Sequence, residues 1–147
     1  MNASGFFRFY RGFAEYHLGN LTQASADFNR AFKEDPTLYT EIGKAFAESI
    51  ANNKSGGLEI LHKLENGIEQ RGVGDPEATY KIAQAYSSMG DVASGLRALR
   101  SSIQAGFFSY PYFLRDPLLG NLRGSPEFQG ILDTARQRHE TFKKAFF

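Results

Sequence analysis

The residues best suited to chemistry in this 147-residue chain are its three histidines, and their spacing does not assemble a site. His17, His62 and His139 fall in three different predicted helices, without a carboxylate or a second histidine at the spacing of a metal-ligand motif. We therefore expect each to be a surface or core-edge residue and not a metal ligand or a general base. Because the chain contains no cysteine, disulfides, thiolate zinc sites and a cysteine nucleophile are excluded.

Phosphate-binding and nucleophile motifs are also missing from the sequence. The stretch NKSGG at 53–57 lacks P-loop spacing, and Gly72-Val73-Gly74 follows a predicted helix, whereas a dinucleotide-binding loop follows a strand. No serine or threonine stands in a nucleophile elbow. We therefore predict a protein that is not an enzyme and has no cofactor, metal or small-molecule substrate. The alternative, an enzyme with a site assembled between helices, would need polar groups that converge on a cavity.

The charge balance gives no reason to expect nucleic acid or an anionic membrane as a partner. The chain has 17 basic and 16 acidic residues, a formal net charge of +1. No apolar run approaches the roughly 20 residues that span a bilayer, and no signal-peptide pattern is present. We therefore expect a cytoplasmic protein that binds neither nucleic acid nor a membrane. The cations near the end of the chain oppose the negative end of a helix dipole; they are Arg136, Arg138, Lys143 and Lys144.

Two helices folded back on each other are predicted between Asp75 and Phe108. Asp75 is a good N-cap, and Pro76 occupies the first helical position. Apolar residues recur at helical spacing up to Gly90 and again up to Gly106: Ala78, Ile82, Ala85, Tyr86 and Met89, then Val92, Leu96, Leu99 and Ile103. Small residues stand where the two helices would touch, at Ala83 and Gly95. A pair of this size cannot bury its own apolar face and needs neighbouring helices.

An internal repeat supplies those neighbours. Asp35-Pro36 aligns with Asp75-Pro76 at a period of 40 residues, which places Gly43 on Ala83. The segment from Tyr10 to Pro36 resembles the tetratricopeptide repeat, whose pattern is a small residue in helix A, glycine at the turn, and small, aromatic and small residues in helix B before a proline. The first unit fills those places with Gly12, Gly19, Ala24, Phe28, Ala31 and Pro36, and the third with Ile82, Ala83, Tyr86, Gly90, Gly95 and Leu99.

The resemblance implies an all-α, right-handed solenoid of three helical hairpins, at about 5–35, 36–74 and 75–107. A capping region over 108–147 would complete a single domain of residues 1–147. The middle unit departs from the pattern in its NNKSGG turn and two extra residues, so the small-residue markers Gly12, Gly43 and Ala83 are spaced 31 and 40 apart.

The capping region carries two further helix starts. Asp116-Pro117 and Ser125-Pro126 repeat the cap-then-proline device, which predicts a short helix over about 117–122 and a long helix from about 126. One narrow seam of the long helix holds Phe128, Ile131, Leu132, Ala135, His139, Phe142 and Phe146. The phrase RDPLLGNLRGSPEFQGIL is similar to the segment that closes such arrays in large bacterial regulators. The alternative function is therefore a regulatory C-terminal segment of a larger bacterial signalling or transcription-regulator protein.

The first predicted helix has two apolar halves, about twice the width that one packing face needs. One half carries Phe6, Phe9, Phe13 and Tyr16, and the other carries Phe7, Tyr10, Ala14 and Leu18. In the family, residues of the first half would line a concave groove. We predict a non-enzymatic scaffold that binds a protein or peptide partner, or a second copy as a homodimer, through Phe6, Phe9, Phe13, Tyr16, Lys44, Glu48, Tyr80 and Gln84. The alternative is that the aromatic residues are core.

Overall fold

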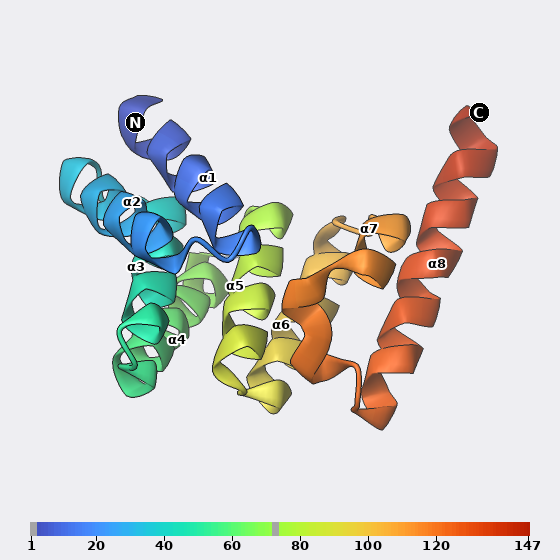
Figure 1. Ribbon diagram of the computed structural model, residues 1–147. Coiled ribbons are helices and arrows are strands. Elements are labelled where there is room, and N and C mark those ends of the chain that lie inside the picture. The colour runs from blue at the N-terminus through green and yellow to red at the C-terminus, as the bar shows by residue number, and fades with distance from the viewer. Residues whose placement is uncertain (1–2, 72–73) are drawn as a thin grey trace. The chain divides into compact units, whose positions relative to one another are not determined.

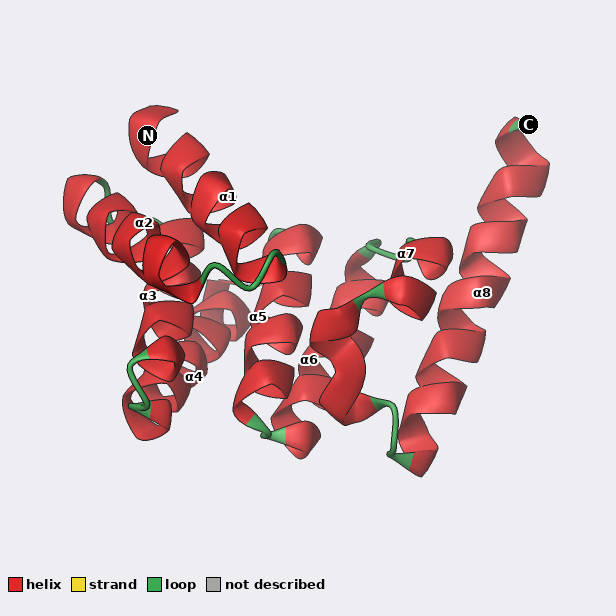
Figure 2. Ribbon diagram, viewed as in Figure 1, coloured by secondary structure: helices red, strands yellow, loops and turns green. Residues whose placement is uncertain are grey.

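The computed structural model describes residues 3–71 and 74–147, and within these ranges the chain forms helices and no strand (Figure 2). The prediction of an all-α protein is confirmed. No helix of the described ranges is both long and apolar enough to cross a membrane. The elements are α1 (Ala3–His17), α2 (Leu21–Glu34), α3 (Leu38–Ile50), α4 (Lys54–Arg71), α5 (Pro76–Met89), α6 (Val92–Ala105), α7 (Tyr110–Arg115), the 3-10 helix η1 (Pro117–Leu122) and α8 (Pro126–Phe146).

The helices belong to two compact units, residues 1–72 with α1 to α4 and residues 73–147 with α5 to α8 (Figure 1). In the first unit α1 packs against α2 and α3, α2 against α3, and α3 against α4. In the second unit α5 packs against α6 and η1, and α8 packs against α6 and α7. Each unit therefore combines packing between successive helices with packing between helices farther apart in the chain, such as α1 with α3 and α5 with η1. The solenoid and the single domain over 1–147 stay predictions.

Most helix boundaries lie where the capping residues predict them. The carboxylate of Asp75 accepts hydrogen bonds from the backbone N–H of Glu77 at 2.9 Å and of Ala78 at 3.4 Å. Gly90 and Gly106 end their helices in the left-handed conformation, with φ of 82° and 118°, which a side chain would disfavour. The predicted helices at 117–122 and from 126 are both present. Residues 72 and 73 of the predicted Gly72-Val73-Gly74 break lie outside the described ranges.

Helix α7 is not predicted from the sequence. This helix has six residues, too few to show a helical period, and Pro111 stands in its first turn. Its one fully buried side chain is Phe113. The element therefore depends on tertiary packing more than on local preference.

The core of the first unit is built around Phe28, where α1, α2 and α3 approach closely. The Phe28 side chain is fully buried, and its ring centroid lies 5.9 Å from that of Phe9 and 5.7 Å from that of Phe46. A Cβ added to Gly43 would lie 2.8 Å from Phe28 Cδ1, and one added to Gly12 would lie 3.0 Å from the same atom. Both helices need glycine where they meet this ring, because the aromatic ring cannot bend aside.

We predict that Gly43→Ala lowers the free energy of unfolding relative to Gly130→Ala. Both glycines are helical, so alanine brings the same gain in helix propensity at each site. A Cβ at Gly130 meets nothing within 4 Å, whereas one at Gly43 would clash with Phe28 and with Phe9. Overpacking of this kind costs about 1–3 kcal/mol. Urea denaturation followed by far-UV circular dichroism measures the difference, and equal stability of the two variants would contradict the packing argument.

Candidate interaction surfaces

Two of the predicted partner-binding residues, Phe9 and Phe13, are core residues of the first unit. The exposed fraction is 0% for Phe9 and 7% for Phe13. Phe9 packs against Phe28 and Tyr39, with ring centroids 5.9 and 5.6 Å apart, and Phe13 packs edge-on against Phe46 at 5.9 Å. Their placement on an open groove wall is therefore corrected, because α2 and α3 close over this half of α1.

Phe6 and Tyr16, on the same half of α1, are half-buried. The Phe6 ring makes an edge contact with Tyr39 at 5.6 Å, and the Tyr16 ring lies 4.9 Å from Phe46. The two residues flank the buried pair along the helix, so part of each ring stays accessible beside the core. The four predicted residues of α1 thus lie in one aromatic cluster, in which Phe6 and Tyr16 remain partly exposed to solvent.

The exposed apolar surface of α1 lies on its other half. Phe7 and Leu18 are 70% and 74% exposed, Ala14 is exposed and Tyr10 is partly so. We call these four residues the outer stripe. One signal in the sequence could have identified the outward half, since Gly12 marks the side of the helix that a neighbour approaches. At about 100° per residue, Gly12 lies near Tyr16 and on the opposite side from Phe7.

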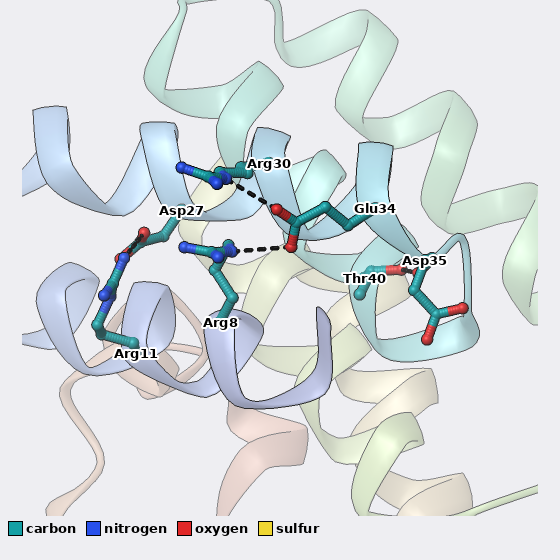
Figure 3. A network of polar contacts seen from close by, with 7 residues as sticks. All are labelled: Arg8, Arg11, Asp27, Arg30, Glu34, Asp35 and Thr40. Carbon is teal, nitrogen blue, oxygen red and sulfur yellow. Dashed lines mark hydrogen bonds and ion pairs between the residues drawn. The ribbon is translucent and has the colours of Figure 1, made fainter. Parts of the chain in front are cut away.

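Two ion pairs join α1 to α2, one between Arg8 and Glu34 and one between Arg11 and Asp27 (Figure 3). Arg8 Nε lies 3.1 Å from a Glu34 carboxylate oxygen, and Arg30 Nε lies 2.8 Å from the other oxygen of that group. Arg11 donates two hydrogen bonds to the carboxylate of Asp27, one of them at 2.7 Å. A shallow cavity of about 210 Å³ beside the pairs is lined by Ser4, Phe7, Arg8 and Arg11. This edge offers an apolar side chain next to guanidinium groups.

Asp27 is the buried member of these pairs. Its side chain is 3% exposed, whereas that of Arg11 is 56% exposed. The hydrogen bond from Arg11 holds the pKa of the Asp27 carboxyl below its ordinary value, against the opposing effect of burial. The pair therefore fixes α1 on α2 through a charge that lies inside the unit, while Arg11 faces solvent. Nearby, the Thr40 hydroxyl donates to the Asp35 backbone carbonyl at 2.7 Å and ties the start of α3 to the end of α2.

Lys44 and Glu48 are half-buried and paired with each other. Lys44 Nζ lies 2.7 Å from a Glu48 carboxylate oxygen and 2.8 Å from the Asn29 side-chain oxygen. The Asn53 amide donates to Glu48 at 2.7 Å, and the hydrogen bond from Lys44 lowers the pKa of the Glu48 carboxyl. The two residues thus connect α3 to α2 and to the turn before α4. Their predicted role in orienting a partner stays a prediction.

Tyr80 and Gln84, predicted on a groove wall of the third unit, are buried and bound to another part of the chain. The Tyr80 hydroxyl and the Gln84 side-chain amide both donate to one carboxylate oxygen of Asp116, the latter at 2.7 Å. The Tyr80 ring stacks on Phe113 with centroids 5.0 Å apart. Burial and the nearby Asp116 charge raise the Tyr80 pKa. Their placement on an open groove wall is corrected, because Phe113 of α7 and Asp116 at the start of η1 cover this face of α5.

The three histidines occupy separate places. The His17 ring lies edge-on to Phe13 at 4.7 Å, His62 is exposed and His139 is half-buried on α8. Among residues 3–71 and 74–147, no three His, Cys, Asp or Glu side chains form a group that could hold a metal ion.

Comparisons with known proteins give one partial likeness. No family model matches the chain, and no solved structure is significantly similar to it. A curated chloroplastic protein from Arabidopsis thaliana is 28% identical over 102 residues, which cover 67% of this chain and 30% of that protein. The chain thus spans about a third of the length of the relative it matches, and a likeness of this size assigns no family.

We predict that Asp27 makes the stability of the first unit fall in acid. Its folded-state pKa lies below the ordinary value of 3.8, so the unfolded chain takes up the proton first. The stabilisation is complete above about pH 4 and is lost as the pH falls toward the lowered pKa. Asp27→Asn should remove this acid dependence and cost about 1–3 kcal/mol at pH 7 through the lost charged hydrogen bonds.

Urea denaturation between pH 3 and pH 7 measures both effects. Glu69→Gln is the matched control, because Glu69 is an exposed carboxylate of the same unit and should leave the profile close to that of the wild type. An Asp27→Asn profile parallel to the wild-type profile would rule out the assignment.

Proposed function

We propose that the chain is a non-enzymatic scaffold of tetratricopeptide-like helical hairpins that binds a protein partner through the outer stripe of α1. The observation that carries the proposal is the exposure of Phe7 and Leu18, at 70% and 74%, on one line of a helix whose other half is core. Leaving apolar area in water costs about 25 cal/mol per Å². Aligned exposed side chains of this size are typical of a surface that another macromolecule covers.

The chemistry bordering the outer stripe supports a protein partner. Arg8 and Arg11 stand beside Phe7 at the shallow cavity of the first unit. A partner helix could place an apolar side chain over Phe7 and a carboxylate near the exposed Arg11, which is a common mode of helix recognition. A second copy of the chain, forming a homodimer, is the other protein partner that this surface would fit.

The repeat pattern and the close approaches around Phe28 support the tetratricopeptide-like assignment. Gly12 and Gly43 hold equivalent places in successive predicted units, and both lie against this one ring of the intervening helix. Small residues at such places let successive hairpins stack. The right-handed solenoid extends this stacking to the hairpin of α5 and α6, and it is part of the proposal.

A second candidate is that the chain works as a segment of a larger regulatory protein. The observation that favours it is the partial likeness, in which the matched relative is about three times longer than the aligned region. A bacterial origin, a role in signalling or transcription, and a cytoplasmic location stay predictions. The chloroplast location in the relative's name is a statement about that protein.

We predict that Phe7→Ala/Leu18→Ala weakens partner binding without loss of helicity. Both side chains are mostly exposed, so their removal should change the free energy of unfolding by less than about 1 kcal/mol. Affinity capture from a lysate of the source organism, combined with sedimentation velocity of the purified chain, measures binding to a partner or to itself.

Leu114→Ala provides the matched control, since Leu114 is 46% exposed in the second unit and should retain binding. Phe9→Ala should instead lose about 3–5 kcal/mol of stability as a core truncation. Capture and self-association that are the same in Phe7→Ala/Leu18→Ala as in the wild type would contradict the proposed surface.

We predict that a solenoid gives one narrow distance between spin labels placed in the two units. Because the chain has no cysteine, Asn66→Cys on α4 and Ala93→Cys on α6 can be labelled selectively, and both positions are exposed. Pulsed electron paramagnetic resonance measures the distribution. Lys33→Cys with Asn66→Cys, within the first unit, gives the reference width. A distribution between units much broader than this reference would contradict fixed stacking of the hairpins.

A further inference from the structure

The apolar seam of α8 continues beyond the helices that cover it. Its first four members, Phe128, Ile131, Leu132 and Ala135, are buried in the second unit, where α8 packs against α6 and α7. Farther along the same line, Phe142 is 47% exposed and Phe146 is 69% exposed. One face of a single helix is therefore core in its first half and uncovered in its second half.

The second half of α8 is uncovered because α8 is longer than α6, the helix on which it packs. At 1.5 Å per residue, the 21 residues of α8 span about 31 Å and the 14 residues of α6 about 21 Å. Arg138 marks the end of the overlap, because its guanidinium donates to the backbone carbonyls of Ile103 and Gln104 in the last turn of α6, the latter at 3.0 Å. This contact fixes the rotation of α8, so the rest of the seam keeps its direction.

The last part of the chain, residues 136–147, where α8 runs past the end of α6, is called the overhang. Aromatic side chains beside it form one wall of a groove. The Phe108 ring lies edge-on to Phe142 at 6.1 Å, Phe142 lies 4.8 Å from Phe146, and the Arg138 guanidinium lies 5.9 Å from the Phe108 ring centroid. A wide, open cavity of about 580 Å³ runs along them, and its lining includes Gly106 and Ala145. We call this cavity the tail groove.

The overhang is also cationic. Residues 136–147 contain Arg136, Arg138, Lys143 and Lys144 against the single acid Glu140. Within the described part of the chain, the salt bridge of Arg136 is to Asp133, whereas Lys143 and Lys144 have no ion pair. Lys143 and Lys144 line a separate cavity with Glu140 and Phe147. Carboxylates on the flanks of a partner along this part of α8 would therefore approach unpaired ammonium groups outside the groove wall.

We infer that the tail groove binds an amphipathic helix of another protein, with apolar anchors one turn apart and acidic flanks. The first half of the seam already packs on a helix, α6, so a helix continues the same interface. A second copy of the chain fits less well, since a two-fold contact would set the same cations against each other. This surface lies in the second unit, and its role does not depend on the outer stripe of α1.

The probe is a synthetic helical peptide of about 15 residues, with leucines at i, i+3 and i+7 and glutamates on both flanks. Calorimetric titration into the full chain should detect binding that Phe142→Ala/Phe146→Ala weakens roughly tenfold or more. Lys143→Glu/Lys144→Glu should also weaken it, with a smaller effect as salt is raised. The matched control Phe7→Ala/Leu18→Ala should bind like the wild type, and circular dichroism checks that each variant is folded.

Three outcomes would overturn the inference. The first is no binding of the acidic peptide, or binding that Phe142→Ala/Phe146→Ala leaves unchanged. The second is concentration-dependent self-association that the same substitution abolishes, which would assign the groove to a second copy. The third is a peptide with lysines in place of the glutamates that binds equally well, or sedimentation of the chain with anionic vesicles in preference to the peptide. A failed outer-stripe test would leave this result unaffected.

Discussion

The packing of the Phe28 ring against Gly12 and Gly43 determines how closely α1, α2 and α3 approach one another. The ring fills the space that side chains at Gly12 and Gly43 would occupy, so α1 and α3 both come close to α2. That approach turns Phe9 inward and builds a core from aromatic rings in edge and stacked contacts. The same rotation of α1 leaves Phe7 outside. Core and candidate surface are thus two results of one packing constraint.

The second unit is organised by a polar contact inside its core. Asp116 is 1% exposed and accepts hydrogen bonds from Tyr80, from Gln84 and from the backbone N–H of Leu118. A buried carboxylate needs such donors, because an unsatisfied charge in the interior is costly. The contact places η1 on α5 and removes Tyr80 from the surface. The face of α5 that was predicted as a groove wall is therefore covered by the chain itself.

Local features of this fold could be predicted from the sequence, and features that depend on distant neighbours could not. The cap at Asp75, the left-handed glycines and the two proline-started helices involve residues within one turn of each other. The inward half of α1 depends on which helices cover it, and both halves are equally apolar. The environment of Tyr80 depends on Asp116, which is 36 residues away and follows a helix too short to show a period. Phe9 and Phe13 were therefore predicted on an open groove wall and lie instead in the core.

The tight fit at Phe28 also makes side-chain volume a property of a pair of positions. The space at residue 43 is set by the ring at residue 28, since 2.8 Å separates that ring from the missing Cβ. A larger residue at position 43 is compatible with the same helix spacing only if the residue at position 28 is smaller and the ring of Phe9, 3.0 Å from the same Cβ, also gives way. Substitutions at positions 28 and 43 during evolution are therefore coupled, because the residue at each position limits the side-chain size that the other position accepts.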